Sequence, residues 1–265
     1  MEKIISPSLR EEIQIKADKI RENPDVYEAR QRRVRDELTS IGDSYSFWIE
    51  NPKLRKAYLL ANKQKKTLMK QARAGIRAVT DGWYFLLDKG RAGNFLQVFT
   101  PYDLERLNAI VYRSKMSPVA KPEPGKRFRR GNVTINVLGY NPPNAREVPE
   151  KIRELLGKVK RTYKEDPLEA AILTHLGIAS IQPFDDGNKR CARLVQSRIL
   201  FDCGLPPAVI PAGEGKFYMG LFTKSVIPFR DGNTKSQRGF YDYCASKVNN
   251  ALDEILDDLH VHRQF

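Results

Sequence analysis

The chain has 265 residues, of which 41% are hydrophobic and 16 are proline, a composition typical of a globular protein that buries a sizeable core. No apolar run reaches about 18 residues and the first residues lack the apolar core of a secretory signal, so we expect a cytoplasmic protein, or one exported by a route that the sequence does not show. Lysine and arginine number 46 against 32 acidic residues, and the net charge of +14 favours anionic partners such as nucleotides, nucleic acid or an acidic protein surface.

The first 94 residues are predicted to form charged helices. The spacing of apolar residues predicts one helix over 7–40 and another over 53–79. A short helical piece at 44–51 ends before Pro52, because the residue before proline avoids helical geometry. Residues 53–77 hold much of the positive charge. A solvated helix face is the simpler interpretation of this run, and direct nucleic-acid binding is the alternative, although no zinc finger, basic zipper or RNA-binding signature accompanies it.

The middle of the chain contains one clear β signal. Residues 83–99 are apolar and interrupted by glycines, after which Thr100 and Pro101 form the N-cap and first position of a helix. The segment 127–143 then alternates apolar with polar residues between turn signals, which is strand periodicity. Its alternating apolar positions are Val133, Ile135 and Val137. We therefore expect a β-hairpin here.

The rest of the chain is predicted to be helical. The expected helices cover 146–160, 166–179, Arg190 to about Cys203, 215–225 and 238–259. The fold class is therefore mainly α with one hairpin.

The loop 182–189 has the properties of a phosphate-binding loop. The sequence Asp186-Gly187-Asn188 permits the backbone angles that turn successive N–H groups into one concavity, at the start of a helix whose dipole favours anions. Arg190 and Arg193 are three residues apart and share one face of that helix, and Asp186 is a suitable oxygen ligand for Mg²⁺. An ordinary helix-capping loop is the alternative. A near-copy, FRDGN at 229–233, is not followed by the same pair of arginines, and we interpret it as coincidence.

The segment resembles the core motif of the Fic-domain family, His-x-Phe-x-Asp/Glu-Gly-Asn-Gly-Arg-x-x-Arg, whose members transfer AMP from ATP to protein hydroxyls. The matching residues are Phe184, Asp186, Gly187, Asn188, Arg190 and Arg193. His175 stands where members commonly carry a buried structural histidine. The resemblance implies a mainly α, Fic-type helical bundle with a β-hairpin flap and an N-terminal helical extension. Its expected parts are an N-terminal region at 1–94, a Fic domain at 95–245, and a C-terminal helix and tail at 246–265.

The resemblance also implies a role for each motif residue. Asp186 would hold Mg²⁺, Phe184 would anchor the loop, and the amides of Gly187, Asn188 and Lys189 would form an anion hole. Arg190 would contact the inner phosphates of ATP and Arg193 the γ-phosphate. The implied cofactors are therefore ATP and Mg²⁺. The flap would clamp a target protein through Thr134, Ile135, Asn136 and Val137.

Two residues depart from the family pattern. Lys189 stands where AMP-transferring members usually have glycine, and lysine there is similar to the Doc branch, which transfers phosphate. Gln182 stands at the position of the catalytic histidine, which removes the proton from the target hydroxyl. A glutamine amide has no usable basicity near neutral pH, and loss of a positioned base typically costs about 10²–10⁴ in rate. The sequence therefore predicts a nucleotide-binding loop without its general base.

An inhibitory signal precedes the domain at residues 46–51. Ser46 to Asn51 resembles the family's inhibitory helix pattern, Ser/Thr-x-x-x-Glu-Gly/Asn. By that resemblance Glu50 would pair with Arg193 and occupy the cation meant for the γ-phosphate. A plain helix end is the alternative interpretation.

Three functions stay open from the sequence. The first is a protein adenylyltransferase whose activity is weak or lost because of Gln182. The second is a nucleotide-binding pseudoenzyme or protein-interaction module, and the third a Doc-like phosphotransferase. A homodimer and a nucleic-acid partner for the basic run at 53–77 are further options that the sequence leaves open.

Overall fold

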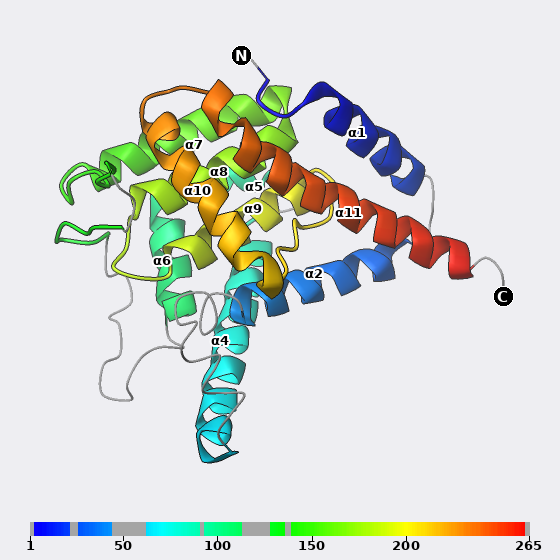
Figure 1. Cartoon of the computed structure of the whole chain (residues 1–265), viewed down its shortest axis with the longest axis horizontal. Helices are drawn as coiled ribbons and strands as arrows, with labels where there is room; N and C mark the ends of the chain where they lie inside the picture. Colours follow the sequence, from blue (N-terminus) through cyan, green and yellow to red (C-terminus); the bar gives the residue numbers. More distant parts are fainter. Residues whose placement is uncertain are drawn as a thin grey trace.

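The computed structural model describes residues 3–21, 26–43, 62–90, 93–112, 128–135 and 139–262. These residues are predominantly helical (Figure 1), which confirms the predicted class. The helices are α1 (Pro7–Arg21), α2 (Val26–Asp43), α4 (Asn62–Asp88), α5 (Phe95–Val98), α6 (Pro101–Tyr112), α7 (Val148–Glu165), α8 (Pro167–Ile181), α9 (Asn188–Asp202), α10 (Gly215–Arg230) and α11 (Arg238–His262). None of them is long and apolar enough to cross a membrane, as far as the described ranges extend.

Helix α8 forms the centre of the bundle. Every residue from Leu168 to Ile181 is buried, as expected for a helix that is apolar on all sides. Helices α7 and α9 pack against it most extensively, and α10 and α11 cover it further. Gly177 permits the close approach of α7, because a methyl group at this position would collide with the Leu155 side chain. The central helix therefore ends in a rigid setting, directly before the loop that begins at Gln182.

Several helix boundaries differ from the sequence-based expectation. The single helix expected over 7–40 is two helices, α1 and α2, with residues 22–25 outside the described part of the chain. Helix α4 continues to Asp88, beyond the predicted end at residue 79. Gly82 does not break this helix, because it lies where α4 meets Leu107 of α6 and Leu194 of α9, each within 3.2 Å of a Cβ built at that glycine. Here glycine serves close helix packing.

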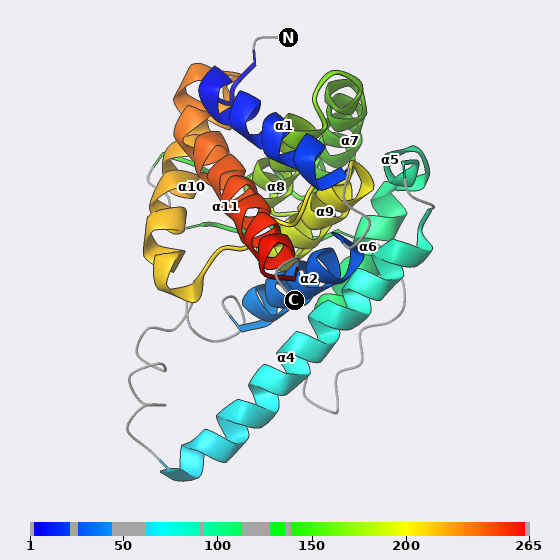
Figure 2. The ribbon, with the colours of Figure 1, turned by 90° about the vertical axis from the view of Figure 1, so that its right-hand side faces the viewer.

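The capping signal at Thr100 is confirmed. Its Oγ1 accepts a hydrogen bond from the Asp103 amide at 3.3 Å, and the Asp103 carboxylate accepts in return from the Thr100 amide at 3.0 Å. This reciprocal pair starts α6 at Pro101. The second half of α4 packs on α6, whereas its first half extends away from the other helices in both views (Figures 1 and 2).

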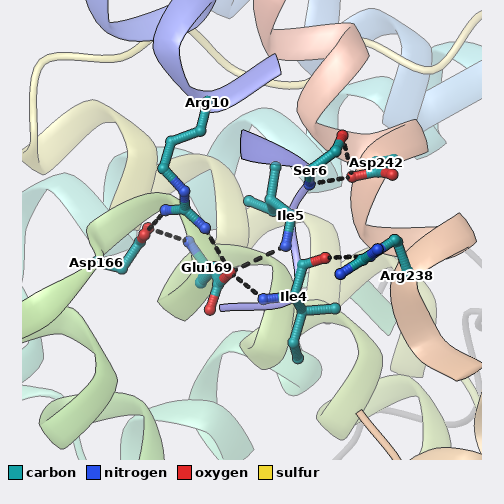
Figure 3. Close-up of polar contacts among 8 residues, drawn as sticks. All are labelled: Ile4, Ile5, Ser6, Arg10, Asp166, Glu169, Arg238 and Asp242. Carbon is teal, nitrogen blue, oxygen red and sulfur yellow. Dashed lines mark hydrogen bonds and ion pairs between the residues drawn. The ribbon is translucent and has the colours of Figure 1, made fainter. Parts of the chain in front are cut away.

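The N-terminal segment is fastened to the domain by a polar cluster (Figure 3). The buried Glu169 carboxylate, at the start of α8, accepts from the amides of Ile4 and Ile5 at 2.5 and 3.0 Å and from Arg10 at 2.6 Å. Arg238 of α11 donates to the Ile4 carbonyl at 3.1 Å. Helix α1 then runs along α11 (Figure 2), and α2 packs on α4, α9 and α11. The N-terminal helices therefore lie directly on the domain that carries the motif loop.

The flap has two extended arms but no regular strand in its described residues, 128–135 and 139–143. The expected strand pairing is therefore corrected for this part of the flap. Pro142 and Pro143 remove two N–H donors from the returning arm, which weakens any ladder. Side chains join the arms instead, since Asn132 Oδ1 accepts from the Ala145 amide at 2.9 Å and Arg129 donates to carbonyls on both arms.

Candidate active site

The motif loop joins the end of α8 to the start of α9, and Asn188 closes it. The Asn188 Oδ1 accepts from the Phe184 amide at 2.9 Å, and its Nδ2 donates to the Phe184 carbonyl at 2.7 Å and to Gln182 Oε1 at 2.9 Å. The Phe184 ring is buried beside that of Phe128, with the ring centres 5.7 Å apart. Phe184 therefore anchors the loop in the core, in the position expected from the sequence.

Gly187 and a residue of α6 shape the turn before α9. Gly187 has φ of 83°, and a Cβ there would lie 2.7 Å from the Asn108 Nδ2. That Nδ2 donates to the Asp186 carbonyl at 2.8 Å. Asn108 is not among the residues predicted from the sequence, although a polar residue beside the apolar stripe of α6 is a detectable signal. The loop is thus supported from α6 as well as by its own side chains.

A cleft opens at the first turn of α9. It is lined by Gln182, Asp185, Asp186, Gly187, Asn188, Lys189 and Arg190. The first intrahelical bond runs from the Cys191 amide to the Gly187 carbonyl at 2.9 Å. The preceding N–H groups belong to the first turn, where no intrahelical acceptor exists and the helix dipole favours an anion. Most of the residues predicted to hold phosphate are therefore brought together around one cleft.

Arg190 and Asp186 lie at this cleft. Arg190 is almost completely buried, and its Nη1 donates to the Val111 carbonyl at 3.1 Å. Its Nη2 is 3.6 Å from the Asp186 carboxylate, which also accepts from the Gly187 amide at 2.5 Å. The Asp186 side chain is 29% exposed. No cluster of three metal-binding side chains occurs in the described ranges. The Asp186 carboxylate at the cleft is an oxygen ligand of the kind that Mg²⁺ takes in proteins.

Arg193 faces α2. Its guanidinium forms a buried ion pair with Glu37, with Nη2 to Oε1 and Oε2 both at 3.1 Å, and Nη2 also donates to Ser40 Oγ at 3.1 Å. Burial raises the pKa of Glu37 to about 7, against the opposing effect of Arg193. Glu50 and Ser46, expected to face Arg193, lie outside the described residues.

Glu37 is not among the residues predicted from the sequence. Its signal is an acidic residue between Val34 and Leu38, on the buried face of a helix. Local spacing shows that such a carboxylate is buried, but does not identify a partner 156 residues away.

Gln182 caps the C-terminus of α8 in an unusual conformation. Its φ of 51° makes it the one non-glycine residue with positive φ in the described ranges. Its side chain donates to the Ala179 carbonyl at 2.5 Å and accepts from Asn188 at 2.9 Å. Strained backbone of this kind is characteristic of functional positions.

His175 is a core histidine. It is fully buried in α8, with Nε2 2.8 Å from the Tyr218 hydroxyl. Burial, together with Arg193, lowers its pKa to about 3. The ring is therefore neutral near pH 7 and held within the core, as expected for the structural histidine.

The remaining predicted residues are Lys189, which lines the cleft, and four residues of the flap. The Lys189 ammonium lies 6.0 Å from the centre of the Phe222 ring on α10. Thr134 is exposed and Ile135 packs partly on the core, whereas Asn136 and Val137 lie outside the described residues.

Comparison with known proteins shows what the central part of the chain is similar to. Residues 98–200 match the model of the Fic/DOC family. Protein adenylyltransferase fic-1 of Caenorhabditis elegans is 30% identical over 114 residues, 42% of this chain and 22% of that protein. Protein adenylyltransferase Fic of Drosophila melanogaster is 32% identical over 104 residues, 37% of this chain and 20% of that protein. The match thus spans about a fifth of each of these curated relatives.

Solved structures show the same fold. A Fic-domain-containing signaling protein from Bacteroides thetaiotaomicron has a TM-score of 0.65 and 17% identity, with 92% of this chain and 95% of that chain covered. A fragment of C. elegans Fic-1 has a TM-score of 0.66 and 17% identity, covering 96% of this chain and 72% of that fragment. Residues 98–200 thus match the Fic/DOC family model, and most of the chain has the fold of solved Fic-domain proteins.

Proposed function

We propose that the chain is a protein adenylyltransferase of the Fic type, which transfers AMP from ATP to a protein hydroxyl. The observation that carries this proposal is the cleft at the start of α9, where first-turn N–H groups, the Asp186 carboxylate and the buried Arg190 converge. A helix N-terminus with arginine in its first turn suits a phosphate group. The names of the relatives in C. elegans and D. melanogaster support the same reaction.

In this reaction the hydroxyl oxygen of the target forms a bond to the α-phosphorus of ATP. The bond from that phosphorus to the bridging oxygen breaks, and pyrophosphate leaves. Arg190 and the first turn of α9 hold the inner phosphates. Mg²⁺, held by Asp186 together with those phosphates, would offset the charge on the leaving group. The flap presents the target segment, and the hydroxyl proton must pass to a base.

Gln182 limits the rate of this step. Its amide cannot accept the proton near neutral pH, and its oxygen and nitrogen already bond to Asn188 and the Ala179 carbonyl. Loss of a positioned base costs about 10²–10⁴ in rate. We therefore expect weak or absent transfer by the chain with Gln182. The same observation favours a second candidate, a nucleotide-binding module that captures a partner strand on its flap without modifying it.

Transfer of phosphate, as in the Doc branch, has less support. Lys189 is the residue that favours it, but its ammonium lies toward the Phe222 ring. Arg193, which the resemblance assigns to the γ-phosphate in AMP transfer, is present.

Glu37 provides an inhibitory contact in this proposal. Its carboxylate makes a bidentate contact with Arg193 inside the protein, and charge-assisted pairs of this type are among the strong hydrogen bonds. An Arg193 engaged in this way is withheld from a γ-phosphate. Glu37 can therefore restrain ATP binding from α2, whatever the role of Glu50.

The test of the function is Gln182→His, alone and with Glu37→Gly, incubated with Mg·ATP labelled at either the α- or the γ-phosphate. Histidine is among the residues that tolerate a positive φ, so it can occupy this position. We expect transfer of the α-label to exposed serine, threonine or tyrosine to rise by about 10²–10⁴, the effect of a general base. The double variant is expected to exceed the single one.

Gln182→Asn is the matched control, since it retains an amide and supplies no base. Label from the γ-position alone would identify phosphate transfer. If neither label reaches protein in the double variant although Mg·ATP binds, the enzyme proposal is wrong and the binding-module proposal replaces it.

A further inference from the structure

Arg129 lies at the base of the flap and donates to three separate parts of the main chain. Its Nε donates to the carbonyl of Gln182 at 2.7 Å, its Nη1 to that of Gly131 at 2.8 Å, and its Nη2 to that of Pro143. Its own amide donates to the Pro183 carbonyl at 2.9 Å. Gly131 and Pro143 lie on opposite arms of the flap. One side chain therefore joins both arms to the catalytic position.

This arrangement is costly for the fold. Arg129 is 4% exposed, and burial lowers the pKa of its guanidinium. In the part of the chain that the structure describes, three carbonyls accept hydrogen bonds from its guanidinium, and the Asp185 carboxylate favours its charged form from outside ion-pair distance. A buried cation without a paired anion is expensive. The rigid guanidinium can nevertheless reach three carbonyls in one geometry, which a lysine ammonium cannot reproduce.

The hydrogen bond to the Gln182 carbonyl fixes the backbone at residue 182. Its residue has the positive φ described above, and such strain persists only where the surroundings fix the backbone. The backbone angles at this residue set the direction of its side chain. The Arg129 Nε is the one side-chain donor to this carbonyl among the described contacts. A displacement of Arg129 would therefore move the flap arms and the side chain at 182 relative to each other.

We propose that Arg129 is a positioning residue for the transfer step. It fixes the main chain of residue 182 to the base of the flap, so that a segment held along the flap presents its hydroxyl to the side chain at 182. The proposal rests on the proposed AMP transfer. It differs from a role in nucleotide binding, because Arg129 does not line the cleft at the start of α9.

The catalytic test uses the Gln182→His background. Arg129→Met removes the three side-chain donors but keeps an unbranched side chain, Arg129→Lys keeps the charge, and Arg130→Met changes an exposed neighbour as the matched control. We expect transfer of α-labelled AMP to fall about 10–100-fold with Arg129→Met, since misplacement by about 1 Å costs up to about 10². The Kd for Mg·ATP should change less than about twofold. Lysine should recover part of the rate, and Arg130→Met should change nothing.

Hydrogen exchange tests the coupling in the natural chain, without Gln182→His. Arg129→Met should raise amide exchange in both flap arms and at Gln182 together. If Arg129→Met leaves AMP transfer unchanged, the proposal is wrong. It is also wrong if the loss of transfer is accompanied by weaker Mg·ATP binding and a lower melting temperature that account for it. If Gln182→His shows no transfer even before Arg129 is changed, the AMP-transfer function fails. Amide hydrogen exchange alone then tests whether Arg129 couples the flap to Gln182. Faster exchange in the flap arms without faster exchange at Gln182 would contradict this coupling.

Discussion

The motif loop and its near-copy share the pattern Phe-x-Asp-Gly-Asn but have opposite surroundings. In the copy, at 229–233, the amides of Asp231, Gly232 and Asn233 donate to carbonyls at the end of α10. At the motif loop, the corresponding glycine and asparagine begin α9 beside the cleft. The copy therefore uses its N–H groups to terminate a helix, at the end of the dipole that repels anions. At the motif loop the first-turn N–H groups lie beside the cleft, at the end of the helix dipole that favours anions.

The two asparagines show the same contrast. Asn188 is buried and closes its loop through Phe184, whereas Asn233 is exposed and accepts from the Ser236 amide at 3.2 Å. An arginine is the tenth residue counted from the phenylalanine of each pattern. Arg193 pairs with Glu37, and Arg238 donates to the Ile4 carbonyl. The same five-residue pattern thus occurs in two different local structures, one at the end of a helix and one at the start of a helix.

The largest expected difference between the loops concerns their arginines. Arg190→Ala should weaken Mg·ATP binding about 10–150-fold, because a charged hydrogen bond is worth about 1.5–3 kcal/mol. Arg230→Ala, in the copy, should leave binding unchanged, since Arg230 is exposed and pairs with Asp231. Calorimetry measures both, with thermal unfolding as the check that each variant folds. Equal effects of the two substitutions would remove the distinction between the loops.

The second test concerns the ion pair between Glu37 and Arg193. Glu37→Gln removes the negative charge with little change of shape, and we expect about tenfold tighter Mg·ATP binding as Arg193 becomes available, an effect in the usual range of coupling energies. Binding to the natural chain should also tighten between pH 8 and pH 6, as Glu37 gains its proton near pH 7. Titration of ATP itself is common to both proteins, so the difference between them isolates Glu37. An identical pH profile for the two would contradict the restraint.

The same group gives a stability test. The folded pKa of Glu37, about 7, lies above its ordinary value of 4.5, so the folded chain binds this proton more tightly. Its contribution to stability is present below about pH 4.5 and is lost as the pH rises through about 7. Glu37→Gln should therefore flatten the fall in the free energy of unfolding between pH 5 and pH 8. Denaturant titrations at the two pH values measure this change.

The smallest expected effect compares the two glycines. Both have positive φ, 83° at Gly187 and 73° at Gly232, and alanine in that region costs about 1–2 kcal/mol. A Cβ at Gly232 meets nothing within 4 Å, whereas one at Gly187 meets the Asn108 amide. Gly187→Ala should therefore be the more destabilising by about 1 kcal/mol, measured by chemical denaturation. Asn108→Ala should recover part of this difference in a double-mutant cycle.

Local signals account for what could be predicted from the sequence. The Thr100–Pro101 cap, the apolar α8 and the existence of α9, which starts two residues before the predicted Arg190, all depend on residues within a few positions of each other. The contacts of Glu37 with Arg193, and of Arg129 with Gln182, join residues 156 and 53 positions apart. Periodicity shows only that such groups are buried. The predicted strand pairing of the flap was wrong for its described residues. Alternation of apolar and polar residues predicts extended arms, but the prolines of the returning arm disfavour a ladder of hydrogen bonds.

The proposed nucleotide site at the start of α9 is tested most directly by a crystal structure of the Glu37→Gln variant grown with Mg·ATP. We expect the triphosphate over the first turn of α9, within hydrogen-bond distance of Arg190, with Mg²⁺ between the phosphates and Asp186. The copy at 229–233 should bind no nucleotide. A nucleotide bound elsewhere on the chain, or a cleft without one at millimolar Mg·ATP, would contradict the account.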